Sequence, residues 1–125
     1  MALAKRSLGS SGLEITTVGF GSWAIGGGGW SYGWGHQDDA ESIATMRHAI
    51  DLGTNWIDTA AIYGLGHSEE VVARLLRDIP QSQRPFIFTK CGMAFESDPM
   101  AEPQRTLKPD SIRRECEASL RRLGV

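Results

Sequence analysis

The chain has 125 residues and a mass of 13.6 kDa, a length that suits one domain rather than two. Its 13 Lys and Arg residues against 15 Asp and Glu give a net charge of −2, which argues against a nucleic-acid-binding or acidic-membrane surface. No apolar run approaches the length of a membrane span, and no apolar segment near the N-terminus predicts a secretory signal. Two cysteines without paired spacing are typical of a reducing compartment, so we expect a cytoplasmic protein.

The first third of the chain predicts a hairpin, a short strand and a loop. Residues 5–16 favour a β-hairpin, because apolar and polar residues alternate on both sides of the turn Gly9–Gly12. Residues 18–23 predict a short strand, whose glycines indicate close approach of another group to the backbone. Residues 26–35 hold six glycines and three aromatic residues, a composition typical of a long flexible loop.

A helix is predicted to begin after Asp38, because Asp38 and Glu41 have the spacing of a capping box. Its apolar face carries Ile43, Met46 and Ile50. Gly53 is placed to end this helix, and residues 55–59 then predict the second strand.

A second helix is predicted to begin at Ser68, which we expect to be its N-cap, and to end before Pro80. Its broad apolar stripe consists of Val71, Val72, Leu75, Leu76 and Ile79. Residues 86–90 predict the third strand. If the strand alternation continues, Cys91 points away from Lys90 and is buried.

A polar loop over residues 96–108 precedes a third helix, which Pro109 is expected to open and Gly124 to end. Its apolar face carries Ile112, Cys116, Leu120 and Leu123. Cys116 is therefore expected in the core.

The pattern is a hairpin followed by three strand–helix units, which predicts an α/β fold with a parallel sheet and right-handed crossovers. We expect a single domain over residues 1–125, with the hairpin at 5–16 and the three βα units at 18–125. No repeat, linker or low-complexity segment divides it.

Three polar side chains follow the predicted strands. Asp58 and Lys90 end the second and third strands, and Tyr63 lies in the loop after Asp58. Neighbouring parallel strands lie about 4.8 Å apart and end at one edge, so we expect an Asp58–Lys90 ion pair beside Tyr63. A phenol has a pKa near 10, and a neighbouring ammonium lowers the pKa of a phenol by stabilising the phenolate. The trio therefore predicts a proton donor to a carbonyl oxygen, and a solvated ion pair without chemical role is the alternative.

Several segments, in order and in register from about Arg6 to Val125, resemble the N-terminal portion of the aldo-keto reductases. They are Gly19–Trp23, Trp56–Ala60 with Tyr63–Gly64, Ser68–Glu70, Phe88–Lys90, and Leu107–Ile112 with Leu120–Leu123. The agreement of many segments in register is far more specific than that of any one of them.

This resemblance implies a (β/α)₈ barrel that binds NADP(H) and reduces a small aldehyde or ketone. It implies that Asp58, Tyr63 and Lys90 are three of four catalytic residues, with Tyr63 as the acid. It also implies that cofactor contacts come from Gly21, Ser22, Trp23 and Asp58, and that the N-terminal hairpin closes the barrel bottom. No metal, nucleic acid or membrane partner is expected.

Other features of such a barrel are not seen in this sequence. The fold needs about 250 residues, and the fourth catalytic residue of the family, a histidine, ends a fourth strand. His36, His48 and His67 are interpreted as loop or surface residues, and His67 with Glu69 and Glu70 lacks the geometry of a metal site. Open sheet edges favour self-association. The alternative is therefore an inactive truncated product or a small α/β interaction module.

Overall fold

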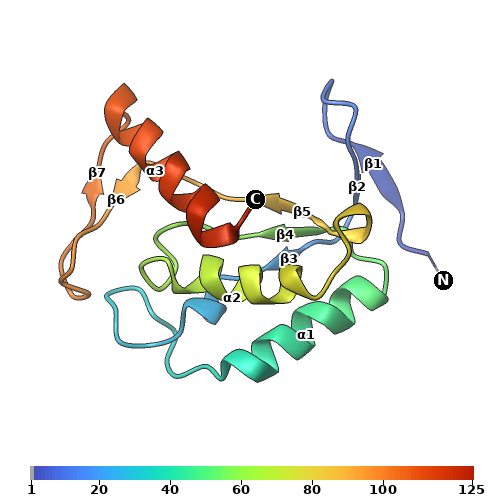
Figure 1. Ribbon diagram of the computed structural model, residues 1–125, viewed down its shortest axis with the longest axis horizontal. Helices are drawn as coiled ribbons and strands as arrows, with labels where there is room; N and C mark the ends of the chain where they lie inside the picture. Colours follow the sequence, from blue (N-terminus) through green and yellow to red (C-terminus); the bar gives the residue numbers. More distant parts are fainter. Residues whose placement is uncertain (1) are drawn as a thin grey trace.

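The computed structural model describes residues 2–125, and a parallel three-stranded sheet lies at its centre (Figure 1). The strand order is β3 (Phe20–Gly21), β4 (Trp56–Asp58) and β5 (Phe86–Phe88), with β4 in the middle. The register places Gly21 opposite Asp58 and Asp58 opposite Phe88. The predicted α/β class is confirmed, although each strand is shorter than its sequence pattern indicated.

Three helices lie beside this sheet: α1 (Asp39–Asp51), α2 (His67–Arg77) and α3 (Pro109–Leu123). Figure 1 shows α1 and α2 on one face of the sheet and α3 beside α2. Short 3₁₀ turns lie at Ala24–Gly26 (η1) and Gln81–Gln83 (η2). The fully buried centre of the core is formed by Met46, Ile57, Val71, Val72 and Leu75. The core thus lies mainly between β4 and the apolar faces of α1 and α2.

Most helix ends follow the sequence. The Asp38 carboxylate accepts a hydrogen bond from the Glu41 amide at 2.8 Å, and Pro109 opens α3. The start of α2 differs from the prediction, because Gly66 with a φ of 98° is the N-cap. Ser68 is already the second residue of the helix, fully buried, and is not its cap.

The predicted hairpin is present as β1 (Lys5–Ser7) and β2 (Glu14–Thr16), paired antiparallel. It lies at the amino end of the sheet, where the Thr16 amide donates to Asn55 Oδ1 at 2.8 Å and Trp56 Nε1 donates to the Thr16 carbonyl at 2.8 Å. The hairpin is thus at the opposite end of β4 from Asp58 (Figure 1).

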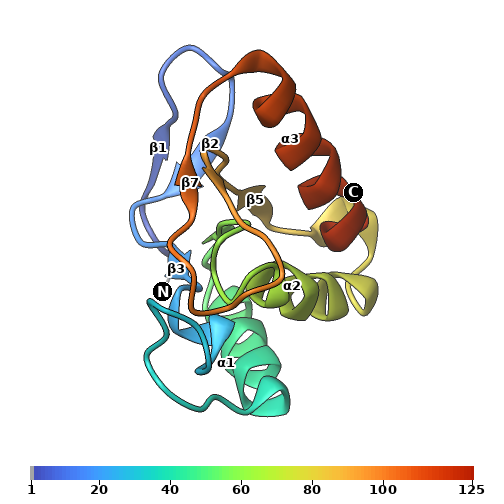
Figure 2. The same ribbon diagram turned by 90° about the vertical axis from the view of Figure 1, so that its left-hand side faces the viewer.

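A second hairpin, which the sequence did not predict, overlaps the predicted loop at residues 96–108 and begins just before it. The strands β6 (Met93–Ala94) and β7 (Gln104–Arg105) pair antiparallel after β5. The loop between them approaches the glycine-rich loop that follows β3, as Figure 2 shows. Ser31 Oγ donates to the Met100 carbonyl at 2.9 Å, and the Tyr32 hydroxyl donates to Glu102 Oε2 at 2.6 Å. These contacts join segments some 70 residues apart, which local sequence patterns do not reveal.

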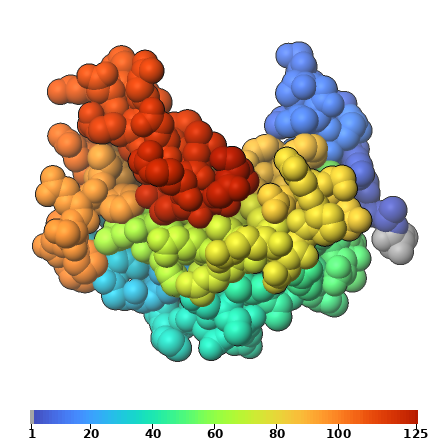
Figure 3. All heavy atoms as spheres, in the orientation of Figure 1, coloured from blue at the N-terminus to red at the C-terminus, as the bar shows by residue number. Residues whose placement is uncertain are grey.

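Some apolar side chains expected in the core are exposed. Of the four residues on the predicted apolar face of α3, only Leu123 is buried, whereas Ile112, Cys116 and Leu120 are exposed. Nothing in residues 2–125 packs against that side of α3, and Figure 3 shows a notch between α3 and the N-terminal hairpin. Cys91 is exposed as well, because β5 ends at Phe88 and the strand alternation does not continue to it. In residues 2–125, no helix combines the length and apolarity needed to cross a bilayer.

Candidate active site

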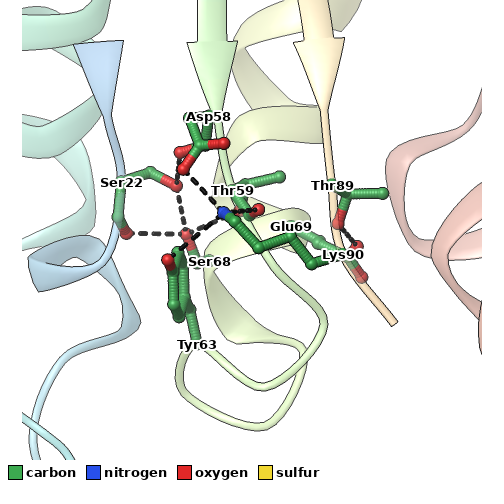
Figure 4. Close-up of polar contacts among 8 residues, drawn as sticks. All are labelled: Ser22, Asp58, Thr59, Tyr63, Ser68, Glu69, Thr89 and Lys90. Carbon is green, nitrogen blue, oxygen red and sulfur yellow. Dashed lines mark hydrogen bonds and ion pairs between the residues drawn. The ribbon is translucent and has the colours of Figure 1, made fainter. Parts of the chain in front are cut away.

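The Lys90 ammonium lies between Asp58 and Tyr63 at the carboxyl end of the sheet (Figure 4). Its Nζ is 2.6 Å from Asp58 Oδ2 and 3.3 Å from the Tyr63 hydroxyl oxygen, and it donates to the Thr59 carbonyl at 2.9 Å. The ion pair predicted from the strand pattern is therefore present, with the phenol beside it. The three side chains come from two strand ends and one loop.

The local chain path explains this convergence. Asp58 is the last residue of β4, opposite Phe88 at the end of β5, and Lys90 follows two residues later. A tight turn then brings Tyr63 back to this edge: its amide donates to the Ala60 carbonyl, and its carbonyl accepts from the Ser68 amide. One strand pairing and one turn are thus enough to assemble the trio.

The surroundings of Lys90 keep it protonated. Partial burial alone lowers the pKa of an ammonium, but the hydrogen bonds to Asp58 and Tyr63, together with their charges, outweigh this effect and raise the pKa of Lys90. The side chain is half exposed, so the site is open to a ligand from solvent. The lysine is therefore a permanent positive charge next to the phenol near neutral pH.

The Tyr63 ring is held by aromatic stacking. The Trp23 indole lies parallel to it, with ring centroids 5.7 Å apart and an interplanar angle of 1°. Trp23 is fixed in turn by a hydrogen bond from its Nε1 to the Tyr32 carbonyl at 3.1 Å. The two loops that carry these rings touch through glycine backbones, because a Cβ on Gly64 would lie 2.3 Å from the Gly26 carbonyl oxygen.

This close approach gives a stability prediction for Gly64→Ala. We expect the free energy of unfolding to fall by about 2–3 kcal/mol, because the left-handed backbone at Gly64 and the steric overlap with Gly26 each cost about 1 kcal/mol or more. Gly124→Ala is the matched control, since Gly124 has a left-handed backbone with a φ of 69° but open space around it. It should lose only about 1 kcal/mol. Urea unfolding measures both, and equal losses would refute the steric part.

A network of buried hydroxyl groups lies beside the trio, at the end of β4. Ser68 Oγ donates to the Ser22 carbonyl at 2.9 Å and lies 3.0 Å from Ser22 Oγ and 3.2 Å from Thr59 Oγ1 (Figure 4). Ser22 Oγ donates to the Asp58 carbonyl at 2.9 Å. Ser22 was predicted to contact a cofactor, but its side chain is fully buried and hydrogen-bonded within the protein. Its position therefore suits it to holding the end of β4 in place.

A buried carboxylate fixes the segment that carries Lys90. Glu69 is fully buried, accepts from the Thr89 hydroxyl at 2.7 Å and pairs with Arg122 Nε at 2.5 Å. It thus joins α2, the end of β5 and α3. The sequence analysis assigned Glu69 no buried partner. Its pairing with an arginine 53 residues later leaves no signal in a single sequence.

The histidines lie outside the trio. His67 was interpreted as a loop residue, but it is the first residue of α2, and its Nε2 is 2.8 Å from Asp39 Oδ1. Arg74 donates to the other oxygen of Asp39, so this cluster joins α1 to α2. His36 and His48 are exposed. Across residues 2–125, no three His, Cys, Asp or Glu side chains are grouped as metal ligands would be.

Gly21 is exposed at the carboxyl end of β3. Gly21 lies opposite Asp58, and nothing within 4 Å would meet a Cβ at this position. The Trp23 indole beyond it is 44% exposed. The backbone at Gly21 is thus exposed between a carboxylate and an indole.

A pocket of about 350 Å³ opens beside Tyr63 and Lys90. Its walls come from the loop after β3, the turn after β4 and the β6–β7 hairpin. The lining residues are Trp23, Trp30, Tyr32, Ala60, Ile62, Tyr63, Lys90, Cys91, Met93 and Arg105. Its size and mainly apolar walls are typical of a small-molecule site.

Comparison with known proteins adds independent information. The family model "Aldo/keto reductase family" matches residues 17–125. The NADH-specific methylglyoxal reductase of Escherichia coli (strain K12) is 37% identical over 131 aligned residues, which cover 98% of this chain and 39% of the relative. Among solved structures, an aldo-keto reductase from Bacillus halodurans in its holo form matches with a TM-score of 0.82 at 28% identity, covering 98% of this chain and 37% of that one. The glycerol dehydrogenase from Gluconobacter oxydans matches with a TM-score of 0.81 at 39% identity, covering 100% and 37%.

These matches define how much of the fold is present. The chain spans less than two fifths of the length of these three relatives. The solved structures are (β/α)₈ barrels, and the three parallel strands with their helices superpose on a part of such a barrel. The partial barrel implied by the sequence is thus confirmed.

Proposed function

We propose, from the premise that the chain belongs to the aldo/keto reductase family, that it contributes the proton-donating side of an active site that reduces aldehydes or ketones to alcohols. One observation carries this proposal: a single ammonium lies within hydrogen-bonding distance of both a carboxylate and a phenol at the mouth of an apolar pocket. A solvated surface ion pair would not need the phenol or the pocket.

Each member of the trio has a role in this reaction. Tyr63 donates a proton to the carbonyl oxygen, and the adjacent Lys90 charge stabilises the phenolate that forms. Asp58 holds Lys90 in position and compensates its charge. A bound nicotinamide supplies the hydride that reduces the carbonyl carbon. Trp23 keeps the Tyr63 ring oriented through stacking.

The proposed cofactor is NADP(H), with its nicotinamide ring against Gly21, Trp23 and Asp58. The relative from Escherichia coli carries the name NADH-specific, so the choice between the two cofactors requires its own measurement. The two unpaired cysteines favour a cytoplasmic protein.

A titration with NADPH and NADH tests the function and the cofactor together. For the whole protein we expect saturable binding of NADPH and reduction of a simple aldehyde. For the 125-residue chain alone we expect neither tight binding nor turnover, since it spans only part of its relatives. The absence of carbonyl reduction in the whole protein would refute the function, and tighter binding of NADH would refute the cofactor choice.

A second candidate is a non-catalytic module that associates through its uncovered surfaces. Three apolar side chains are exposed, namely Ile112 and Leu120 on α3 and Phe86 on β5. Exposed apolar side chains of this kind mark a surface that can bind another protein. We propose that the isolated chain self-associates through these surfaces. Sedimentation of the chain without cofactor measures its mass in solution. A mass above that of one chain supports self-association, and the mass of a monomer contradicts it.

A further inference from the structure

The pocket beside Tyr63 has two cationic side chains in a mainly apolar wall. Lys90 stands on the side of the catalytic trio, and Arg105 comes from the β6–β7 hairpin. The other lining residues are aromatic, aliphatic or sulfur-containing. A second formal charge in such a pocket has no part in the proton transfer proposed above and requires a separate explanation.

Strand pairing accounts for the position of Arg105. Arg105 lies directly opposite Met93 in the hairpin, so the two side chains share one face. Met93 lines the same pocket and packs against the cluster around Trp30. The neighbouring pair, Ala94 and Gln104, lies on the other face and lines a separate groove. The hairpin register therefore turns Arg105 toward the pocket.

Lys90 and Arg105 differ in how many hydrogen-bond and ion-pair partners the protein gives them. The three N–H groups of Lys90 have three acceptors in Asp58, Thr59 and Tyr63, so its charge and donors are already used. Arg105 takes part in none of the five ion pairs found within residues 2–125. Its guanidinium therefore keeps free donors at the pocket wall.

The neighbourhood of Tyr32 supports this placement. The Tyr32 hydroxyl donates to Glu102, and this hydrogen bond is the main reason why the pKa of Tyr32 is raised. Arg105 lowers the pKa of the same hydroxyl through its charge and a hydrogen bond, and both residues line the pocket. Glu102 is engaged by Tyr32 and lies more than 4.0 Å from any Arg105 nitrogen.

We propose that Arg105 determines substrate specificity by binding a carboxylate on the carbonyl compound that the site reduces. This inference rests on the proposed function and names its substrate class: an oxo acid with an apolar body. The carbonyl oxygen faces Tyr63, the apolar body lies along the walls that include Trp23 and Trp30, and the carboxylate pairs with Arg105. A guanidinium binds a carboxylate through two parallel hydrogen bonds, and Arg105 is exposed and therefore accessible to such a group.

Calorimetric titration of the whole protein with 4-formylbenzoate and 4-formylbenzamide tests the inference, because the two probes have nearly the same shape and differ in charge. We expect the carboxylate to bind at least about tenfold tighter, the equivalent of one good charge-assisted hydrogen bond. The preference should disappear in Arg105→Gln, survive in part in Arg105→Lys, and weaken at high salt. Arg6→Gln is the control, since Arg6 lies in the N-terminal hairpin, away from this pocket.

The outcomes separate this inference from the proposed function. Equal affinity for the two probes, binding of neither, or a preference that persists in Arg105→Gln overturns the role of Arg105. A loss of NADPH affinity in Arg105→Gln with an unchanged probe preference also overturns it, because the anion would then be a cofactor phosphate. If the carboxylate preference is present but no variant reduces either aldehyde, the role of Arg105 stands and the proposed function fails.

Discussion

Replacing Tyr63 by Phe is expected to lower kcat for carbonyl reduction by at least about 10²-fold, the usual contribution of a general acid. The change removes only the hydroxyl that lies 3.3 Å from Lys90 Nζ. The ring remains and can still stack on Trp23, so the pocket wall and the proposed nicotinamide surface are preserved. Cofactor affinity should therefore stay largely unchanged. Steady-state kinetics and a cofactor titration on the same preparation measure the two effects.

The chain has only one other tyrosine, which provides a matched control. Tyr32→Phe also removes one hydroxyl from the pocket region, but that hydroxyl bonds to Glu102 and not to Lys90. We expect a loss of about tenfold or less, the effect of one hydrogen bond outside the proton path. If Tyr63→Phe retained near-normal turnover, or if the two variants lost the same amount, Tyr63 would not be the acid.

The parts of the fold predicted from sequence are those that depend on local patterns. The Asp38 cap, the strand that ends at Asp58 and the glycine that ends α3 were each identified from spacing within one turn or one strand. Parallel pairing then followed from the repeated strand–helix order, and with it the Asp58–Lys90 ion pair. A site built on neighbouring strand ends is therefore accessible from sequence.

The parts that sequence reasoning missed depend on conformation or on distant contacts. Gly64, Leu65 and Gly66 all have positive φ angles, and this unusual path starts α2 earlier than the Ser68 pattern indicated. The strands β6 and β7 have two residues each, too few for an alternation pattern to appear. Arg105 reaches the pocket only because those short strands pair, so no spacing in the sequence could indicate it.

Glu69→Gln is expected to reduce the free energy of unfolding by about 3 kcal/mol, because it leaves the Arg122 charge without its buried partner. Arg122 retains 21% exposure of its side chain and regains some hydration, which places the loss at the lower end of the range for buried pairs. If the Gln oxygen accepts from Thr89, its NH2 group faces the Arg122 N–H, so the variant loses both the charge and the acceptor for Arg122. Denaturant unfolding of the two proteins at neutral pH gives the difference directly.

Glu70→Gln separates the ion pair from the helix dipole. Glu70 is the next residue in the same first turn of α2, and it is exposed. Both substitutions remove one negative charge near the helix N-terminus, a contribution of about 0.5 kcal/mol. The remaining loss in Glu69→Gln then measures the buried contact that ties α3 to the segment carrying Lys90. If both variants lost the same free energy of unfolding, this contact would add no stability beyond the helix dipole. Asp58 and the strand pairing would then be left to position Lys90.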